Sequence, residues 1–487
     1  MTSERISGPG ARAVLTAVAL LLGAAPLAAQ QPRPCMRLSR AGTEVQGEVR
    51  VCPGRYRVPD PGEEGVLVVT APGTTINLTN VVLESGESVP GQFVGAGVLA
   101  RNVDAVTITG GAIRGYRHGI RIEGGRGHRI AQVDVSGSRL EPLRSTETTF
   151  DPADWLNVAA PAVFEQYGAG IVLRNTEGVI VTRIRSQRGQ NGIALIGVRD
   201  SYIADSDVSG NAGWGIHLWA SARNTIVRNI ARENVRCETA AYSKGCGSAA
   251  LLLRERSDSN LIADNDLTAS GNGLLMAGGP PDLEPSVGNT VVRNDGSFAY
   301  HTAFEATYSS GNLFIDNRAD SSAYGFWLGY STSTTVRGNR VLGARQAGIA
   351  IAHGADNSIA GNTVIGGQVG IRIFAPDSAG PASRGYRIDD NLLAECVEAI
   401  SLERTTQARI RGNLFDMVGD ALVIDESGAA TEVAGNFFLR ARGNYIDAPR
   451  LSAGGNFWGT FDLDAAARKV KGDIILEPWR PASAGGF

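Results

Sequence analysis

The chain has 487 residues, a formal net charge of −3 at pH 7 and 43% hydrophobic residues. Because acidic and basic residues nearly balance, no broad basic surface is expected, and nucleic acid is excluded as the expected partner. The 62 glycines and an aromatic share of only 6% are typical of a fold with many tight turns between short strands.

The first 29 residues have the pattern of a secretory signal peptide. Arg5 and Arg12 precede an apolar run at 13–22, and small residues follow up to Ala29. Cleavage is expected after Ala29, which makes the mature protein secreted or periplasmic. The apolar run is too short for a stable membrane span, so none is predicted.

The chain contains five cysteines, which fit export to an oxidising compartment. We predict two disulfides, Cys35 with Cys52 and Cys237 with Cys246, and a buried thiol at Cys396. No cysteine has the CxxC or histidine spacing of a zinc site, so the sequence predicts no metal-ligating cysteine.

Thirteen short segments share one pattern, in which a small residue is followed by an apolar, a variable and an apolar residue. Most of these segments lie about 22 positions apart. A period this short, sustained over most of the chain, predicts a solenoid in which each repeat forms one turn. The segments open at Gly97, Gly119, Gly170, Gly192, Gly215, Ala250, Gly273, Ala303, Gly325, Gly348, Gly370, Ala399 and Ala421.

The repeat at 348–369 shows the pattern within one turn. Ile349 and Ile351 alternate with Ala350, as in a strand with one buried face. An α/β repeat is the structural alternative, but so short a turn has little room for a helix. We therefore predict an all-β fold, a right-handed parallel β-helix of about 13 turns between residues 97 and 435. An asparagine that recurs at each corner is expected to form one stacked column, made of Asn229, Asn265, Asn294, Asn317, Asn339 and Asn362.

The repeats also define the parts of the chain. The signal peptide at 1–29 is followed by an N-terminal cap with the first strands at 30–96, the β-helix repeats at 97–455 and a C-terminal cap at 456–487. A short amphipathic helix is expected at 464–471. Insertions on a solenoid tend to collect on the binding face. Longer gaps in the period place insertions near 137–168, 234–247, 279–287 and 377–385.

The repeat phrases G-I-x-L and N-x-I-x-x-N, with Cys52-Pro53-Gly54-Arg55-Tyr56 and Asn456-Phe457-Trp458-Gly459, resemble one known superfamily. It is the pectate-lyase-like superfamily, and within it the NosD-like, or "carbohydrate-binding and sugar hydrolase", branch. The resemblance spans roughly residues 45–480 and implies the β-helix fold. It leaves the activity open, because the branch holds lyases, epimerases, hydrolases and accessory proteins.

A second, local resemblance concerns Asp151-Pro152-Ala153-Asp154. This phrase resembles the D-P-H-D motif of periplasmic alginate C5-epimerases, which share the fold class. Ala153 stands where that motif has histidine, so the residue that would abstract a proton is absent from the phrase.

Charged residues also recur at the corners of the repeats. One set is expected to stack as a solvated ladder of alternating charge, at Asp205, Arg228, Asp264, Arg293 and Asp316. A second set lies on the other side of the corner, at Asp207, Asp266 and Asp295. Carboxylate oxygens suit Ca²⁺, so Ca²⁺ is the one cofactor considered, although no calcium-loop consensus accompanies these residues.

The outward positions of the first strand carry unusual side chains in the middle repeats. Aromatic rings beside Arg, Glu and His suit a sugar chain, whose apolar faces lie against rings while its hydroxyls take hydrogen bonds. The expected substrate-binding residues are Trp214, Trp219, Tyr308, Tyr324, Trp327, Tyr330, His353 and Phe374. The expected catalytic residues are His217, Arg254, Glu255, His301, Glu305 and Arg372. The alternative is that the insertions at 234–247 and 279–287 fold over these rings as ordinary packing.

Several functions are compatible with this face, each with a polysaccharide or oligosaccharide as partner and a monomer as the expected state. The leading hypothesis is β-elimination or C5 epimerisation of an acidic glycan, with a histidine or tyrosine as base and arginine neutralising the carboxylate. A hydrolase would instead need two carboxyl groups, for which Glu255 and Glu305 are the candidates. The alternatives are a non-catalytic carbohydrate- or surface-binding solenoid and a NosD-like periplasmic accessory protein.

Overall fold

The computed structural model describes residues 34–146, 148–156, 166–237, 246–279, 283–376, 380–425 and 430–478. The predicted signal peptide at 1–29 lies outside these residues. The chain divides into two units, Met1–Cys35 and Met36–Phe487, and every element below belongs to the second. In the described ranges, no helix is long and apolar enough to span a membrane.

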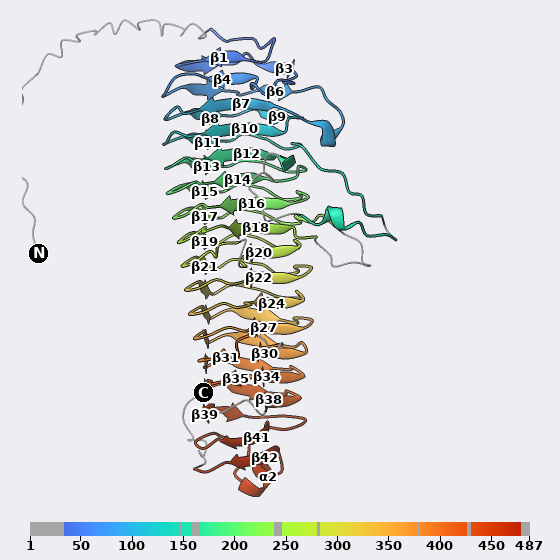
Figure 1. Cartoon of the computed structure of the whole chain (residues 1–487), viewed down its shortest axis with the longest axis vertical. Helices are drawn as coiled ribbons and strands as arrows, with labels where there is room; N and C mark the ends of the chain where they lie inside the picture. Colours follow the sequence, from blue (N-terminus) through green and yellow to red (C-terminus); the bar gives the residue numbers. More distant parts are fainter. Residues whose placement is uncertain are drawn as a thin grey trace, which may run out of the picture. The chain divides into compact units, whose positions relative to one another are not determined.

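The second unit is the predicted right-handed parallel β-helix, a stack of strands in which the chain advances by one turn per repeat (Figure 1). Its longest sheet has 17 strands, and we call it the long sheet. The 13 predicted repeats are confirmed as its strands from β7 to β38, with two further strands at each end. In order, the strands are β1 (Thr43–Val45), β4 (Leu67–Val69), β7 (Ala96–Arg101), β10 (His118–Glu123), β12 (Ala169–Arg174), β14 (Ile193–Ile196), β16 (Trp214–Trp219), β18 (Ala249–Arg254), β20 (Asn272–Met276), β22 (Thr302–Ala306), β24 (Tyr324–Trp327), β27 (Ala347–Ala352), β30 (Val369–Phe374), β34 (Glu398–Leu402), β38 (Asp420–Ile424), β41 (Ile446–Ser452) and β42 (Val470–Ile475).

A second sheet of 15 strands closes the other main side of each turn. Its strands are β2 (Glu48–Arg50), β5 (Thr75–Asn77), β8 (Thr107–Thr109), β11 (Arg129–Ala131), β13 (Ile180–Thr182), β15 (Tyr202–Ala204), β17 (Thr225–Val227), β19 (Leu261–Ala263), β21 (Thr290–Val292), β23 (Leu313–Ile315), β25 (Thr335–Arg337), β28 (Ser358–Ala360), β32 (Arg387–Asp389), β36 (Arg409–Arg411) and β39 (Glu432–Ala434).

Shorter sheets complete the turns near the two ends. They are β3 (Gly54–Arg57), β6 (Val81–Glu84) and β9 (Ala112–Arg114); β26 (Arg340–Leu342), β29 (Thr363–Ile365), β33 (Leu392–Ala394), β37 (Leu414–Asp416) and β40 (Phe437–Phe438); and the pair β31 (Ser383–Arg384) and β35 (Thr405–Thr406). The helical segments with described bounds are two 3₁₀ turns, η1 (Pro90–Gln92) and η2 (Pro152–Asp154), and the short helix α2 (Leu463–Ala467).

Apolar side chains that point inward fill the space between the sheets. Ile349 and Ile351 on β27 are completely buried, as their alternation with Ala350 predicts. At the C-terminal end, the buried ring of Trp458 stacks on Phe438 with 4.7 Å between ring centroids, so the closing sequence phrase covers the last turns of the core. The predicted helix at 464–471 is shorter than expected, because residues 470–475 join the long sheet as β42.

The predicted asparagine column is confirmed and extends further than expected. Each side-chain amide donates to the amide oxygen of the next turn over 2.9 to 3.1 Å, which continues the column beyond Asn362 to Asn456. These asparagines are buried. The column therefore satisfies polar groups that the tight corners would otherwise leave without partners.

Four of the five residues predicted to form a ladder of alternating charge form two exposed ion pairs. Arg228 binds Asp205 at 2.8 Å, and Arg293 binds Asp264 at 2.7 Å. Exposed pairs of this kind contribute about 0–1 kcal/mol each. Asp266, a carboxylate considered for Ca²⁺, pairs with Arg232 instead. Across the described residues, no group of three or more His, Cys, Asp or Glu side chains is placed to hold a metal ion.

Candidate functional site

The outward face of the long sheet carries the predicted site residues in two regions. Strand alternation points them away from the core, and they form small apolar clusters separate from it. One region, on β16 to β20, is covered by inserted segments. The other, on β22 to β30, is open, and we call it the open face.

Four expected surface residues are buried in the covered region, and Trp219, with 9% exposed, is the least buried of them. Trp214 is completely buried, donates its indole N–H to the Gly247 carbonyl at 3.0 Å and packs against Tyr167. His217 lies with its ring 4.6 Å from that of Trp214 and is only 1% exposed. Arg254 is also completely buried. The expectation that these side chains form an exposed surface is therefore wrong, because inserted residues pack over them.

Burial also changes the ionisation of His217. The loss of solvent lowers its pKa well below the ordinary value, and the positive charge of Arg254 lowers it further. His217 is therefore neutral at neutral pH.

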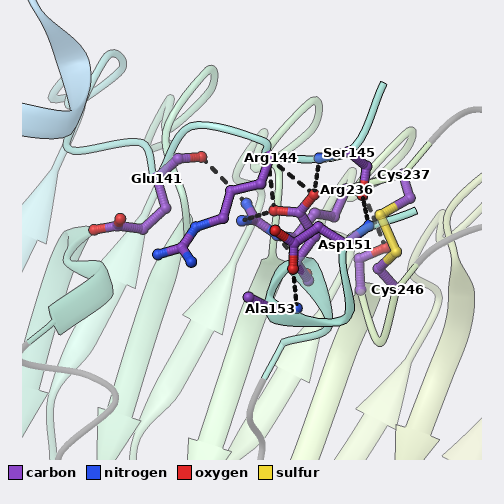
Figure 2. Close-up of a disulfide and its surroundings, with 10 residues drawn as sticks. Glu141, Arg144, Ser145, Asp151, Ala153, Arg236, Cys237 and Cys246 are labelled. Atoms are coloured by element: carbon purple, nitrogen blue, oxygen red, sulfur yellow. Dashed lines mark hydrogen bonds and ion pairs between the residues drawn. A yellow bond between two sulfur atoms is a disulfide. The ribbon is translucent and has the colours of Figure 1, made fainter. Parts of the chain in front are cut away.

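The covering segment, residues 137–146 and 148–156, is held in place by a buried ion pair with Arg236, which precedes a disulfide-bonded cysteine in the chain. We call this segment the arm; in Figure 1 it extends from the side of the stack between β11 and β12. Asp154 accepts hydrogen bonds from the backbone of Arg144 and Ser145 and pairs with Arg236 at 3.5 Å. Figure 2 shows Arg236 pointing into the arm beside the bond between Cys237 and Cys246. The second half of the Asp-Pro-Ala-Asp phrase is thus structural.

The predicted disulfides agree with the bonding state of every cysteine. Cys237 and Cys246 are bonded to each other, Cys35 and Cys52 are each disulfide-bonded, and Cys396 is a free, buried thiol. Disulfides persist in oxidising compartments, which indicates an extracytoplasmic protein.

A cavity of about 540 Å³ lies at the edge of the covered region. It is lined by Trp219 and Glu255 together with charged side chains that include Arg223, Arg256 and Glu284. Glu255 accepts a hydrogen bond from the backbone N–H of Glu284 at 3.4 Å. Two of the predicted site residues therefore lie at this cavity rather than on the open face.

Glu305 occupies the centre of a polar cluster on β22 at the start of the open face. Its carboxylate accepts a hydrogen bond from the Asn272 side chain at 3.2 Å and lies 3.5 Å from Nδ1 of His301. The Glu305 side chain is 15% exposed and that of His301 is 51% exposed. A held carboxylate and an open imidazole thus lie within reach of one bound molecule.

Aromatic side chains continue from this cluster along the next turns. Tyr324 contacts Trp327 edge-to-face at 4.8 Å, and Trp327 contacts Phe374 in the same way at 5.9 Å. Arg372 places its guanidinium over the Phe374 ring at 4.4 Å and pairs with Glu403 at 3.3 Å. The structure therefore places four predicted residues in one row that begins next to Glu305, although the Phe374 ring at its far end is buried, with 7% exposed.

Tyr324 is a potential proton donor in this row. Its hydroxyl donates to the side-chain oxygen of Gln346. Partial burial raises the pKa of Tyr324, and the charge of Arg372 opposes that rise. Tyr324 therefore holds its proton at neutral pH.

Three further predicted residues form a ladder at the corner that follows the open face. Tyr308 and Tyr330 are stacked at 4.4 Å, and Tyr330 and His353 are stacked at 4.7 Å. Nδ1 of His353 lies 2.7 Å from the Pro381 carbonyl oxygen. Stacking between turns engages ring faces that could otherwise bind a sugar, so only the Tyr308 end of the ladder, 36% exposed, offers accessible ring surface.

Sequence reasoning missed Asn272 and Gln346, which hold Glu305 and Tyr324. Asn272 immediately precedes the small residue of its repeat, at the same register position as Trp214 and Tyr324. That shared register was the one available signal for Asn272. Gln346 lies just before β27 and had no signal in the repeat pattern.

Comparison with known proteins assigns the family. A family model for NosD, described as a periplasmic copper-binding protein, matches residues 69–280 and 255–463. The chain belongs to the NosD family. No curated protein matches its sequence.

Solved structures with similar folds include two enzymes and an adhesin. The A-module of the mannuronan C-5 epimerase AlgE6 of Azotobacter vinelandii is 12% identical, with a TM-score of 0.44, and the match covers 76% of this chain and 90% of that chain. The periplasmic alginate epimerase AlgG is 12% identical, with a TM-score of 0.38 and coverage of 79% and 84%. PfbA, a surface adhesin of Streptococcus pneumoniae, is 12% identical, with a TM-score of 0.39 and coverage of 82% and 84%.

The description of the NosD family raises the question of a copper site. Soft metals are bound by thiolate, thioether and imidazole ligands. All five histidines and all five cysteines lie in the described residues, yet no group of three or more His, Cys, Asp or Glu side chains is placed there to hold a metal ion. Four cysteines are in disulfides, and burial raises the pKa of the Cys396 thiol to about 12. The described residues therefore do not fit a copper ion.

Proposed function

We propose that this NosD-family chain binds an oligosaccharide on the open face, from Glu305 to Phe374, and transfers protons on the bound sugar. The reaction that the side chains support best is β-elimination or C5 epimerisation of an acidic glycan. The observation that carries this proposal is the Glu305 carboxylate, held by Asn272, beside the exposed imidazole of His301. An N-terminal signal peptide at 1–29 and secretion are part of the same proposal.

The dimensions of the open face suit a short sugar chain. Glu305 and Arg372 are three strand steps apart, through Trp327 and Ala350. At about 4.8 Å per step this is roughly 14 Å. The rings of Tyr324 and Trp327 are half-buried, which leaves apolar surface for sugar faces while hydroxyl groups bond to the neighbouring polar atoms.

Different residues of the open face can supply the separate chemical groups that elimination or epimerisation needs. Removal of the proton beside a carboxylate needs a base, a positive group at that carboxylate and an acid on the other side. Glu305 or His301 supplies the base, and Tyr324 holds a proton to donate. Arg372, roughly 14 Å from Glu305, supplies positive charge to a carboxylate further along the bound chain. A hydrolase has less support, because it needs two carboxyl groups at one site. Glu255 accepts a hydrogen bond from the backbone of Glu284 at the edge cavity, whereas Glu305 accepts one from Asn272 on the open face.

Non-catalytic glycan binding is the second candidate, and one observation favours it. Arg372 is already engaged with Glu403 at 3.3 Å and with the Phe374 ring at 4.4 Å. A group that must neutralise a substrate carboxylate would have to leave these partners. A binding protein needs no such rearrangement.

The two candidates are separated by assaying the purified secreted protein with a panel of polyuronates and neutral glycans. Absorbance of unsaturated ends reports elimination, and deuterium uptake at C5 in D₂O, followed by NMR, reports proton abstraction. Glu305→Gln keeps the shape and removes the charge, so it should abolish turnover while binding persists. Trp327→Ala should weaken binding by about 1–3 kcal/mol, by analogy with base–aromatic stacking.

Glu432→Gln is the matched control, because Glu432 is an exposed residue on β39 in the second sheet. It should leave both binding and turnover unchanged. Unchanged binding and turnover in both Glu305→Gln and Trp327→Ala would rule out the open face as the site. Binding without turnover in the wild type would select the non-catalytic candidate.

A further inference from the structure

Arg254, on the outward side of β18, carries a buried charge without a hydrogen-bonded partner. The side chain is completely buried, and Nε, Nη1 and Nη2 each lack a hydrogen-bond partner among the described residues. Its guanidinium lies 6.0 Å from the centre of the Trp219 ring. Burying a cation that is neither paired nor hydrogen-bonded costs several kcal/mol, so the position calls for a bound group with acceptor atoms.

The charge of Glu255 acts on Arg254, but the surrounding side chains leave the guanidinium without a hydrogen-bonded partner. Trp219 precedes Arg254 in the long sheet, and the register of β18 with β20 places Ala277 next to it on the following turn. His217 is neutral and buried nearby, as its pKa indicates. The adjacent acid, Glu255, is bonded to the backbone of Glu284. Nothing among these neighbours offers the guanidinium a hydrogen-bonded carboxylate.

The cavity of about 540 Å³ reaches the surroundings of Arg254. Its lining includes Trp219, the ring beneath the guanidinium, and Glu255, the next residue in the chain. Ala220, also in the lining, donates its backbone N–H to the Arg254 carbonyl at 3.1 Å. A ligand in this cavity therefore contacts immediate neighbours of Arg254, whose own side chain is buried and does not line the cavity.

We propose that Arg254 binds an oxyanion that comes from the cavity over Trp219. A guanidinium presents a planar fork of N–H groups that matches the two oxygens of a carboxylate, sulfate or phosphate. The source favoured by position is the carboxylate of an acidic glycan, a statement that rests on the function proposed for the open face. Arg254 is two strand steps from Thr307 beside Glu305, about 10 Å, so one chain could reach both.

The test uses the full secreted protein, with binding measured by calorimetry and unfolding temperature measured at constant ionic strength. The probes are an oligogalacturonate, a neutral oligosaccharide of equal length, and sodium sulfate against sodium chloride. Arg254→Met removes the charge and the fork, and Arg254→Lys keeps the charge without the fork. Arg293→Gln is the control, because Arg293 is an exposed arginine paired with Asp264.

The wild type should bind the oligogalacturonate at least tenfold more tightly than Arg254→Met does, with Arg254→Lys between them and Arg293→Gln unchanged. If sulfate also raises the wild-type unfolding temperature and fails to do so in Arg254→Met, the site takes free oxyanions as well. At a free ligand concentration one hundred times Kd, binding should stabilise the folded wild-type protein by about 2.7 kcal/mol.

Equal responses of the wild type and Arg254→Met to every anion would overturn the proposal. Equal binding of the neutral oligosaccharide by both proteins, without any anion effect, would leave the open face intact and reject only the role of Arg254. A sulfate effect that depends on Arg254, in a protein that binds no glycan, would support the oxyanion site and reject the function proposed for the open face.

Discussion

Replacing Asn294 by alanine tests what the asparagine column contributes to the β-helix. The Asn294 amide oxygen accepts from the backbone N–H of Asn265 at 3.0 Å and from its side-chain amide at 2.9 Å. The Asn294 amide group donates to Asn317 at 3.1 Å and to the Ile262 carbonyl at 2.9 Å. Alanine removes all of these bonds. Asn317 still accepts from the backbone N–H of residue 294 at 2.9 Å, so the main loss falls on Asn265.

The magnitude follows from the two N–H groups of Asn265 that lose their acceptor. Both are buried, and an unsatisfied buried group costs about 1–3 kcal/mol. We expect Asn294→Ala to lower the free energy of unfolding by about 2–6 kcal/mol. Because each turn contacts only its neighbours, the loss should concentrate in the turns around β19 to β23.

Urea unfolding measures the overall loss, and hydrogen exchange of backbone amides locates it. The control is Thr290→Ala on the same turn, a half-buried side chain of β21, which should change the free energy of unfolding by less than about 0.5 kcal/mol. If Asn294→Ala stays within about 0.5 kcal/mol of the wild type, the column is not a major source of stability and the reasoning above fails.

Two further predictions concern the arm and the free thiol. Burial opposes ionisation of Asp154, but hydrogen bonds from Ser145 and Arg144 and the charge of Arg236 outweigh it and lower its pKa. The stabilisation is therefore complete above the ordinary pKa of about 3.9 and is lost as pH falls through the lower folded value, so limited proteolysis with an acid-active protease should cut the arm only below about pH 4. Cleavage that is equally fast at pH 6 would contradict this role. Cys396, whose pKa burial raises to about 12, should react with a thiol reagent only after unfolding, and rapid labelling of the native protein would show that it is accessible.

The fold was predictable because the repeated sequence pattern shows which residues of successive turns lie side by side. The small residue that opens each segment, the alternation that follows and the corner asparagine recur at fixed offsets, and each offset has one physical explanation in a parallel β-helix. Asn229 and Asn265 could therefore be placed on neighbouring turns although 36 residues separate them along the chain. The insertion between them leaves the register on either side unchanged.

The exposure of the site was not predictable in the same way. Strand alternation correctly places Trp214 and Trp327 on the outward face, but only the structure shows that Trp214 is completely buried while Trp327 is not. That difference depends on where the arm packs. The contact between Asp154 and Arg236 joins residues that are 82 positions apart, and it follows no repeat. The periodic sequence shows which side chains point outward, whereas the segments outside the repeat determine which of those side chains are buried.

This division explains how one scaffold can carry different functions. Inward residues and corner asparagines are constrained by every neighbouring turn, while outward residues of the long sheet can change with little effect on the stack. Insertions then decide which outward residues meet solvent. In this chain they cover β16 to β20, leave Glu305 and Trp327 accessible, and enclose Arg254 beside a cavity. A buried charge at the boundary between covered and open regions lowers the free energy of unfolding, and a ligand that binds to this charge offsets the loss.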